Sequence, residues 1–564
     1  MVEKGVRMLK RLRALFTVCC IVLPIFVTIT WLHYSSISYL FQEFPNFNNI
    51  LSEKSQKVTA VISKEADPAI AVKVKDQRIT LEPEDNSSAG PTRVDDEDNQ
   101  QLHGLDMAST FNNEGSCLSR CQSHFYRKSS LHKPSSHLKS KLRHYEHLHT
   151  TCAPSFSFIR NHYTNPNNST IKHDADHSTN CRYLIWSAMD GLGNRILSLV
   201  SAFLYAVLTD RVLLVKFESD MGGLFCEPFP NSSWLLSPRD FPDHWEDDGD
   251  QEHKELSTHH RPVLHLRHTN DDHYDFFHCG STQDLLQKVP VLILQSNQYF
   301  VPSLFTIPSF RKDLTEMFPE KDVIFHLLGH CLLHPSNVAW KFIRNFYQTH
   351  LAMANQKIGL QIRVFDTHRE PHQVVLNKII ACVSKNNLLP QSDKQIIPVT
   401  NSPSLSQNYT SKAVLVISLY SEYGDKIKAM YMANTSVTNG EVIRVYQPSH
   451  EEHQNSNDNK HNMKAWTEMY LLSLCDVLVT SSYSTFGYVA QSLGGLKPWI
   501  LNRTFGGEEV PSSDPPCVRA MSMDPCFHYP PKRDCSSNTI ANITSLFPHT
   551  VHCEDFGNGV KLIN

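Results

Sequence analysis

Apolar runs that alternate with amphipathic segments most constrain how this 564-residue chain folds. Runs such as Tyr183-Leu-Ile-Trp-Ser and Ala413-Val-Leu-Val-Ile-Ser-Leu are continuously apolar, which predicts strands buried on both faces. Further such runs lie at 211–216, 289–294, 357–365, 441–446 and 476–480, and helical patterns lie at 336–354, 464–474 and 487–493. Strands separated by helices are typical of parallel sheets. The pattern predicts an α/β fold with two lobes, 101–350 and 351–510, facing a cleft.

The first candidate site is a glycine-rich turn at Gly191-Leu-Gly-Asn-Arg, between the run at 183–187 and a long apolar run that ends at Leu208. The order strand, tight turn, helix exposes the free N–H groups of the new helix, and the positive end of its dipole attracts anions. Gly193, Asn194 and Arg195 are therefore candidate phosphate-binding residues. An ordinary tight turn is the alternative, because the dinucleotide-binding fingerprint is incomplete.

The second candidate site is Arg363, near the end of the predicted strand at 357–365. An apolar strand has no use for an arginine in its core unless the charge is paired. The pairing alternative is a buried ion pair with an acid such as Asp366. The functional interpretation is a cation at the carboxyl end of a strand, facing phosphate in the cleft.

The third candidate site is Thr480-Ser-Ser-Tyr-Ser-Thr-Phe-Gly, which follows the strand at 476–480. Hydroxyl groups at a strand-to-helix junction supply helix caps and donors to a bound anion. Ser484, Thr485, Phe486 and Gly487 are the candidate residues, and helix capping alone is the alternative.

The N-terminal region predicts a membrane anchor. Cations in the tail at 1–13 precede an uncharged apolar run at 14–32, which is long enough to span a bilayer. The positive flank predicts a cytoplasmic tail and a translocated remainder, with a cleaved signal peptide as the alternative. The polar, charged segment that follows predicts a disordered stem at 33–100. The net charge of −4 argues against a nucleic-acid partner.

Most of the 15 cysteines lie beyond the predicted span, where disulfides persist. Cys517, Cys526, Cys535 and Cys553 predict two disulfides in a stapled segment at 511–564, and the sequence leaves their three pairings open. An odd number of translocated cysteines predicts at least one thiol outside these bonds. The acidic runs at 95–98 and 247–250 follow no clear strand, so we interpret them as solvated loops and predict no metal site.

The runs at 116–120, 191–199, 224–230, 358–365, 447–452, 464–470, 484–491 and 520–528 together resemble plant xyloglucan-type fucosyltransferases, in the same order. The resemblance covers residues 101–564. It implies a GT-B-like fold of two Rossmann-like lobes, with acceptor binding at 101–350 and GDP-fucose binding at 351–510. It also implies a single-pass type II protein of the Golgi membrane that moves L-fucose from GDP-fucose to a galactose 2-hydroxyl of a glycan. We also expect that the reaction inverts the anomeric centre, that it requires no metal and that the protein forms a homodimer.

The chemistry of this resemblance assigns roles to the candidate residues. Charge grows on the departing diphosphate, so without a metal fixed cations and amide dipoles must stabilise it. Arg363 is the first choice, with Asn297 and Asp366 as further catalytic candidates. The sequence differs from the family pattern at Asn297, His330, Tyr483 and Ser492, and an asparagine cannot accept a proton as a general base. A non-catalytic glycan-binding protein and a protein O-fucosyltransferase are therefore the rival functions.

Overall fold

The computed structural model describes residues 117–153, 181–216, 219–236, 263–266, 277–368, 370–390, 410–432, 441–502, 515–531, 544, 547 and 549–564. These residues belong to one compact unit, Arg93–Asn564. The predicted anchor at 14–32 and stem at 33–100 lie outside the described residues.

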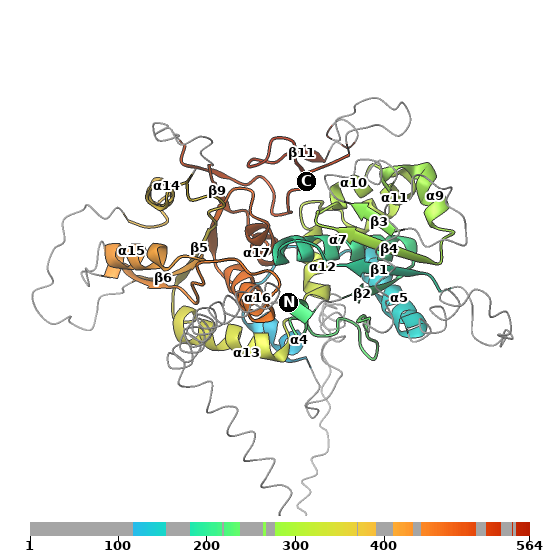
Figure 1. Ribbon diagram of the computed structural model, residues 1–564, viewed down its shortest axis with the longest axis horizontal. Coiled ribbons are helices and arrows are strands. Elements are labelled where there is room, and N and C mark those ends of the chain that lie inside the picture. Colours follow the sequence, from blue (N-terminus) through green and yellow to red (C-terminus); the bar gives the residue numbers. More distant parts are fainter. Residues whose placement is uncertain are drawn as a thin grey trace, which may run out of the picture. The chain divides into compact units, whose positions relative to one another are not determined.

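The first sheet has four parallel strands in the order β2-β1-β4-β3 (Figure 1). Its strands are β1 (Tyr183–Ser187), β2 (Val212–Lys216), β3 (Val263–Leu266) and β4 (Val291–Ser296). In β1, Leu184 and Trp186 pack into one apolar cluster, whereas Tyr183 and Ile185 pack into another. The strand is buried on both faces, which explains why its sequence lacks polar alternation.

The second sheet has six strands in the order β10-β9-β8-β5-β6-β7. They are β5 (Gln356–Ile362), β6 (Thr410–Ser418), β7 (Glu441–Tyr446), β8 (Val477–Ser481), β9 (Trp499–Leu501) and β10 (Cys517–Arg519). All neighbours pair in parallel except β9 and β10, which are antiparallel. A separate antiparallel pair joins β11 (Thr550–His552) and β12 (Val560–Leu562). The parallel strands predicted from the apolar runs are therefore present.

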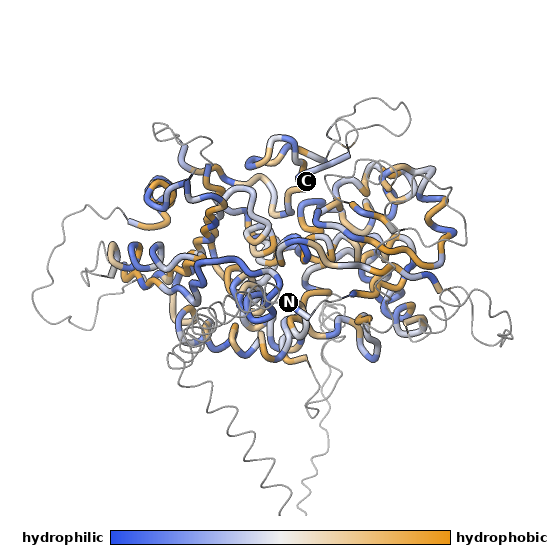
Figure 2. The backbone as a smooth tube through the Cα atoms, viewed as in Figure 1, coloured by the Kyte–Doolittle hydropathy of each residue, from blue (hydrophilic) through white to orange (hydrophobic). Residues whose placement is uncertain are grey.

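The helices connect and cover these sheets. They are α4 (Leu118–Gln122), η1 (Ser123–Phe125), α5 (Ser136–Cys152), α7 (Leu192–Thr209), η3 (Ser219–Met221), α9 (Gly280–Leu286), α10 (Val301–Leu304), α11 (Pro308–Met317), α12 (Ile324–Leu332), α13 (Asn337–Phe346), η6 (Tyr347–Leu351), α14 (His372–Lys385), α15 (Ser421–Met432), α16 (Asn459–Ser473) and α17 (Thr485–Gly494). Hydrophobic residues concentrate along the strands that these helices cover (Figure 2).

The two sheets share one hydrophobic core. Helix α17 contacts α7, α12 and α16, and Figure 1 shows these four helices between the sheets. One buried cluster includes Trp186 of the first sheet, Val489 of α17 and Leu415 of the second sheet. Helices α16 and α17, which follow β7 and β8 in the sequence, thus pack against α7, which covers the first sheet, as well as against the second sheet. The sequence pattern predicted separate lobes and did not reveal this shared core.

Helix α7 is the described helix that is long and apolar enough to cross a membrane, and 89% of it is buried. The packing of α7 against β1, β2 and β4 accounts for its apolar composition. It is a core helix of this fold.

The disulfides correct the predicted C-terminal pairing. Cys526 pairs with Cys553 as one of the expected pairings allowed, but Cys517 pairs with Cys382 of α14. Cys535 lies outside the described residues. Two further disulfides join Cys117 to Cys226 and Cys152 to Cys181. The thiol of Cys475 is buried and belongs to no disulfide, in agreement with the expectation of a thiol outside these bonds.

Candidate active site

A cavity of about 320 Å³ lies at the carboxyl ends of strands from both sheets. Its lining includes residues that follow β1, β4, β5, β6 and β8, among them Asp190, Asn297, Arg363, Leu419 and Tyr483. Carboxyl ends of parallel strands are where open α/β sheets bind ligands, because the loops and helix N-termini gather there. The cavity is therefore the candidate active site.

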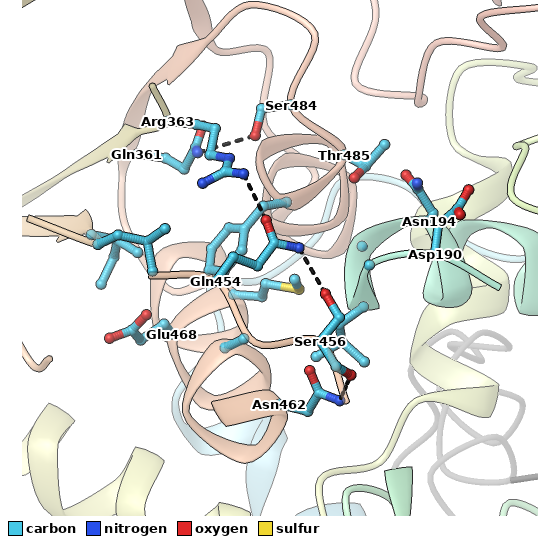
Figure 3. Close-up of a pocket in the computed structure, with 18 of the residues that line it drawn as sticks. Asp190, Asn194, Gln361, Arg363, Gln454, Ser456, Asn462, Glu468, Ser484 and Thr485 are labelled. Atoms are coloured by element: carbon cyan, nitrogen blue, oxygen red, sulfur yellow. Dashed lines mark hydrogen bonds between the residues drawn. The ribbon is translucent and has the colours of Figure 1, made fainter. Parts of the chain in front are cut away.

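Arg363 lines this cavity and keeps its charge available. Its Nη2 donates to Oε1 of Gln454 over 2.6 Å (Figure 3). Its guanidinium lies 5.0 Å from the centre of the Phe365 ring. Its backbone N–H donates to Ser481 Oγ over 2.8 Å, which fixes the end of β5 against β8. No carboxylate within the described residues forms an ion pair with Arg363, so the pairing with Asp366 is absent. Burial lowers the pKa of Arg363, and a bound anion would offset that cost.

Two helix N-termini meet beside the cavity. A Cβ placed on Gly193 of α7 would lie 2.6 Å from Thr485 Oγ1 and 2.9 Å from the Phe486 backbone nitrogen. Only a glycine permits this approach. The N-cap positions, Gly191 and Ser484, make no side-chain capping bond. The first-turn N–H groups of both helices therefore have no intrahelical or capping acceptor, and their dipoles add to the attraction for an anion.

The residues predicted around these helices divide into two groups. Gly193, Asn194, Ser484, Thr485 and Phe486 line the cavity. The hydroxyl of Ser484 accepts from Gln361 Nε2 over 3.1 Å, so this side chain orients the β5 end and does not cap α17. The alternative of helix capping alone therefore does not hold for Ser484.

Arg195, Asp366 and Gly487 do not line the cavity. Arg195 is 6% exposed, because its Nη1 lies 2.6 Å from Asp220 Oδ2 and its Nε donates to the Asp190 carbonyl. Asp220 already pairs with the charge of Arg195. The arginine therefore has a structural role in place of the predicted contact with phosphate.

Asp366 and Gly487 also have local roles. Asp366 Oδ1 accepts the backbone N–H of His368 over 2.9 Å, which closes a turn after β5. A Cβ on Gly487 would lie 3.0 Å from Gln361 Oε1. This glycine therefore admits the side chain of Gln361, a residue of the cavity lining, between α17 and β5.

Asp190 is a cavity residue that the sequence did not single out, although it precedes the first glycine of the predicted turn. Its Oδ2 accepts from Asn297 Nδ2 over 2.5 Å, and Asn297 Oδ1 accepts from Gln298 Nε2 over 2.8 Å. Asp190 has a φ of 58°, a left-handed conformation that is uncommon outside glycine. The predicted site residue Asn297 thus holds the Asp190 carboxylate beside the N-terminus of α7.

The C-terminal segment supplies another wall of the cavity, through His528 and Tyr529. The ring of Tyr483 stacks on His528 with 4.3 Å between centroids, and its hydroxyl lies 3.1 Å from that of Tyr529. Tyr483 also has a φ of 58°, and its backbone N–H donates to Asp555 Oδ2 over 2.8 Å. The sequence motif identified Tyr483, but its partners come from more than 40 positions away.

His330 and Ser492, which differ from the family pattern, lie outside the cavity lining. His330 Nε2 is 2.9 Å from the Leu493 carbonyl, where it donates to the last turn of α17. Ser492 Oγ donates to the Met523 carbonyl over 2.7 Å. Both residues support the end of α17 that lies far from its ligand-facing N-terminus.

The described residues contain one group that could hold a metal ion, formed by His137, Asp313 and Glu316. It lies on α5 and α11, outside the cavity lining, and Lys141 Nζ is already 2.7 Å from Asp313.

The sequence profile of the family described as xyloglucan fucosyltransferase matches residues 71–253 and 243–536. The chain belongs to the xyloglucan fucosyltransferase family. Galactoside 2-alpha-L-fucosyltransferase of Pisum sativum is 47% identical over 484 residues, covering 83% of this chain and 82% of that protein. The Arabidopsis thaliana protein of the same name is 47% identical over 478 residues, covering 82% and 83%.

A solved structure of Arabidopsis thaliana FUT1, a mutant in complex with GDP, superposes with a TM-score of 0.71. It is 44% identical and covers 82% of this chain and all of that one. A structural relative of this chain has thus been solved with GDP bound.

Proposed function

We propose that this protein is a fucosyltransferase that moves L-fucose from GDP-fucose to a galactose 2-hydroxyl of a xyloglucan, arabinogalactan or related glycan. The observation that carries the proposal is the convergence of Arg363 and two uncapped helix N-termini on one cavity. Membership of the xyloglucan fucosyltransferase family supplies the donor and the acceptor class.

The cavity suits departure of a diphosphate. As the bond from fucose to phosphate breaks, negative charge grows on the phosphate oxygens and positive charge grows on the sugar. Arg363 and the first-turn amides of α7 and α17 stabilise the departing charge, and they are already oriented before the reaction. Gln454 holds the Arg363 guanidinium in place through its 2.6 Å hydrogen bond.

The acceptor hydroxyl must lose a proton as it attacks the sugar. Asp190 is a carboxylate of the cavity lining near the N-terminus of α7, and Asn297 fixes one of its oxygens. In the proposed reaction Asp190 accepts the proton, attack occurs opposite the leaving diphosphate, and the anomeric centre inverts. Asn297 orients Asp190 and takes no proton itself.

The finer parts of the proposal rest on the resemblance and on the sequence. They are a GT-B-like pair of lobes with the donor on the second, a metal-independent reaction, a homodimer, and a single-pass type II anchor in the Golgi membrane. The donor assignment is supported by Arg363 and the junction after β8, which belong to the second sheet.

The test is an acceptor screen with detergent-solubilised full-length protein and GDP-fucose. Xyloglucan, arabinogalactan and a folded protein are offered in parallel, with donor hydrolysis measured in their absence. We expect transfer to a galactose-containing glycan. Transfer to protein alone, or GDP-fucose left intact in every arm, would refute the proposal.

A further inference from the structure

Two segments that are far apart in the sequence form one exposed face of the protein. Segment 117–135 contains α4 and η1, and segment 336–353 contains α13 and η6. The backbone N–H of Leu118 donates to Asn337 Oδ1 over 2.8 Å, and Figure 1 shows α4 and α13 side by side. We call the exposed side of these two segments the α4/α13 face.

The α4/α13 face is rich in exposed apolar side chains. Among the described residues, six of the eleven large apolar side chains that are exposed lie on these two segments: Leu118, Phe125, Leu131, Val338, Phe342 and Met353. One side of α13 already packs into the core through Trp340 and Ile343. On its other side Val338 and Phe342, one turn apart, are 58% and 53% exposed. The outer side of a surface helix is ordinarily polar, and gathered apolar side chains mark a binding surface.

The same two segments carry cations and no acidic residue. Their sequences contain no Asp or Glu, and their Lys and Arg residues are Arg120, Arg127, Lys128, Lys133, Lys341 and Arg344. The whole chain has a net charge of −4, so the excess of cations is local. Lys128 pairs with Asp476 over 2.7 Å, whereas Lys133 and Lys341 form no ion pair within the described residues. The face therefore combines exposed apolar groups with positive charge that is only partly neutralised.

A phospholipid surface has the chemistry that matches this combination. Apolar side chains enter the boundary between headgroups and acyl chains, while nearby cations contact anionic lipid. A second copy of the chain is a poorer match. A twofold interface would set this acid-free face against itself and would leave its cations without partners.

The path of the chain also favours a membrane. The described part of the chain begins at Cys117, on this face, where a disulfide to Cys226 and the hydrogen bond of Leu118 hold it in place. The predicted anchor at 14–32 precedes that point. A tether that enters at this face raises the concentration of bilayer that the face meets, so even weak lipid contacts become occupied.

We propose that the α4/α13 face binds the surface of a bilayer that contains anionic phospholipid. No residue of the face lines the cavity, so lipid binding is an activity separate from fucose transfer. The inference takes the tether from the proposed anchor, and it takes the face itself from the described residues.

The test is photo-crosslinking of the full-length protein in lipid nanodiscs. Phe342→p-benzoylphenylalanine places a reactive group on the face, and mass spectrometry measures lipid adducts in phosphatidylcholine discs with and without phosphatidylserine. The matched control position is Leu285 of α9, which is 46% exposed and lies off the face. Adducts at Phe342 should exceed those at Leu285, and phosphatidylserine should increase them by about fivefold or more, the effect of one cation near an anionic surface.

A charge variant tests the electrostatic part. Lys341→Glu adds an acid to the face and should lower the lipid adducts at Phe342 by about fivefold or more. Lys312→Glu makes the same change at an exposed lysine of α11 and should leave the adducts unchanged. Both variants should keep the wild-type rate of transfer to a soluble oligosaccharide in detergent. Val338→p-benzoylphenylalanine repeats the measurement one turn away, should the Phe342 variant fail to fold.

The outcomes separate this inference from the proposed function. Equal lipid adducts at Phe342 and Leu285, or adducts that do not respond to phosphatidylserine, would overturn it. Crosslinks between two protein chains at Phe342 would assign the face to a second copy and overturn it as well. If the full-length chain stays out of the discs, the proposed anchor is wrong, and co-sedimentation of that chain with vesicles of the same two compositions decides the face. Transfer in detergent does not depend on any of these results.

Discussion

Arg363 is the residue on which donor chemistry depends most. Its guanidinium lines the cavity and meets an amide and an aromatic ring, with no carboxylate to neutralise it within the described residues. Arg363→Ala should lower the rate of transfer by about 10²–10³-fold, which is typical for loss of one charge-stabilising donor. Steady-state kinetics with GDP-fucose measure it.

The matched control is Arg519→Ala, in the same sheet. Arg519 lies over the Trp499 ring at 5.3 Å and does not line the cavity. This variant should keep the wild-type rate. Equal losses in the two variants would show that the effect of Arg363→Ala comes from the sheet and not from the departing charge.

Asn297 orients the carboxylate of Asp190, which it contacts over 2.5 Å. Asn297→Asp would place two carboxyl groups at this distance, and like charges so close share a proton. The acidic limb of the pH profile of kcat/KM should move upward by roughly one unit or more.

The matched variant is Asp190→Asn, which removes the proposed proton acceptor and should abolish that limb together with most of the transfer. An Asn297→Asp profile that coincides with the wild-type profile would contradict the assigned pair.

At the scale of elements, α7 and α17 act together through Gly193. A methyl group at this position would overlap the Thr485 hydroxyl and the backbone at Thr485 and Phe486, which cannot yield without separating the helices. Gly193→Ala should lower the free energy of unfolding by about 1–3 kcal/mol and raise the KM for GDP-fucose. Thermal unfolding and donor kinetics measure the two effects.

Gly557→Ala is the control, because nothing lies within 4 Å of a Cβ added there. It should change neither quantity. A Gly193→Ala protein with wild-type KM would mean that the close approach of the helices is structural only.

Helix α17 is held at both ends by residues from distant elements. At its N-terminus, Asp555 Oδ2 accepts both the Tyr483 N–H and the Tyr488 hydroxyl, the latter over 2.6 Å. At its C-terminus, His326 and His330 lie within hydrogen-bonding distance of the last carbonyls. This explains how the strained turn at Tyr483 persists and why the α17 N-terminus keeps its direction toward the cavity.

For the whole molecule, buried histidines and acids predict how stability depends on pH. Burial lowers the pKa of seven described histidines below the ordinary 6.5: that of His149 and His326 to about 4, that of His278, His334 and His528 to about 3, and that of His330 and His350 as well. These histidines bind protons in the unfolded chain but stay neutral in the folded protein. The free energy of unfolding therefore decreases as the pH falls below 6.5. Below pH 6.5, each histidine that stays neutral lowers the free energy of unfolding by about 1.4 kcal/mol per pH unit.

Two buried acids act in the opposite direction. Burial raises the pKa of Glu468 and of Asp524 to about 8, so the folded protein keeps protons that the unfolded chain releases. Their contribution to stability is lost as the pH rises from about 4 to about 8. Below pH 6.5 the histidines outweigh them, and between pH 6.5 and 8 the two acids dominate among the described groups.

The ligand-free protein should therefore be most stable near pH 6.5 and less stable on both sides. Thermal unfolding between pH 4.5 and 9 measures this, and Glu468→Gln should flatten the alkaline side. An unfolding temperature that keeps rising up to pH 8 would contradict the prediction.

The sequence by itself determined the parallel strands, since runs buried on both faces have no polar alternation, and it pointed to Arg363 because a charge in such a run is conspicuous. It also identified the turns at Gly193 and Ser484, where local residue types fix the chain path. Roles that depend on distant partners were decided only by the tertiary structure. Asp220 neutralises Arg195, Cys382 takes Cys517, and the ends of β6, β7 and α16 bury Glu468. The physical reason is that pairing, burial and pKa arise from contacts between segments far apart in the chain, which local pattern does not encode.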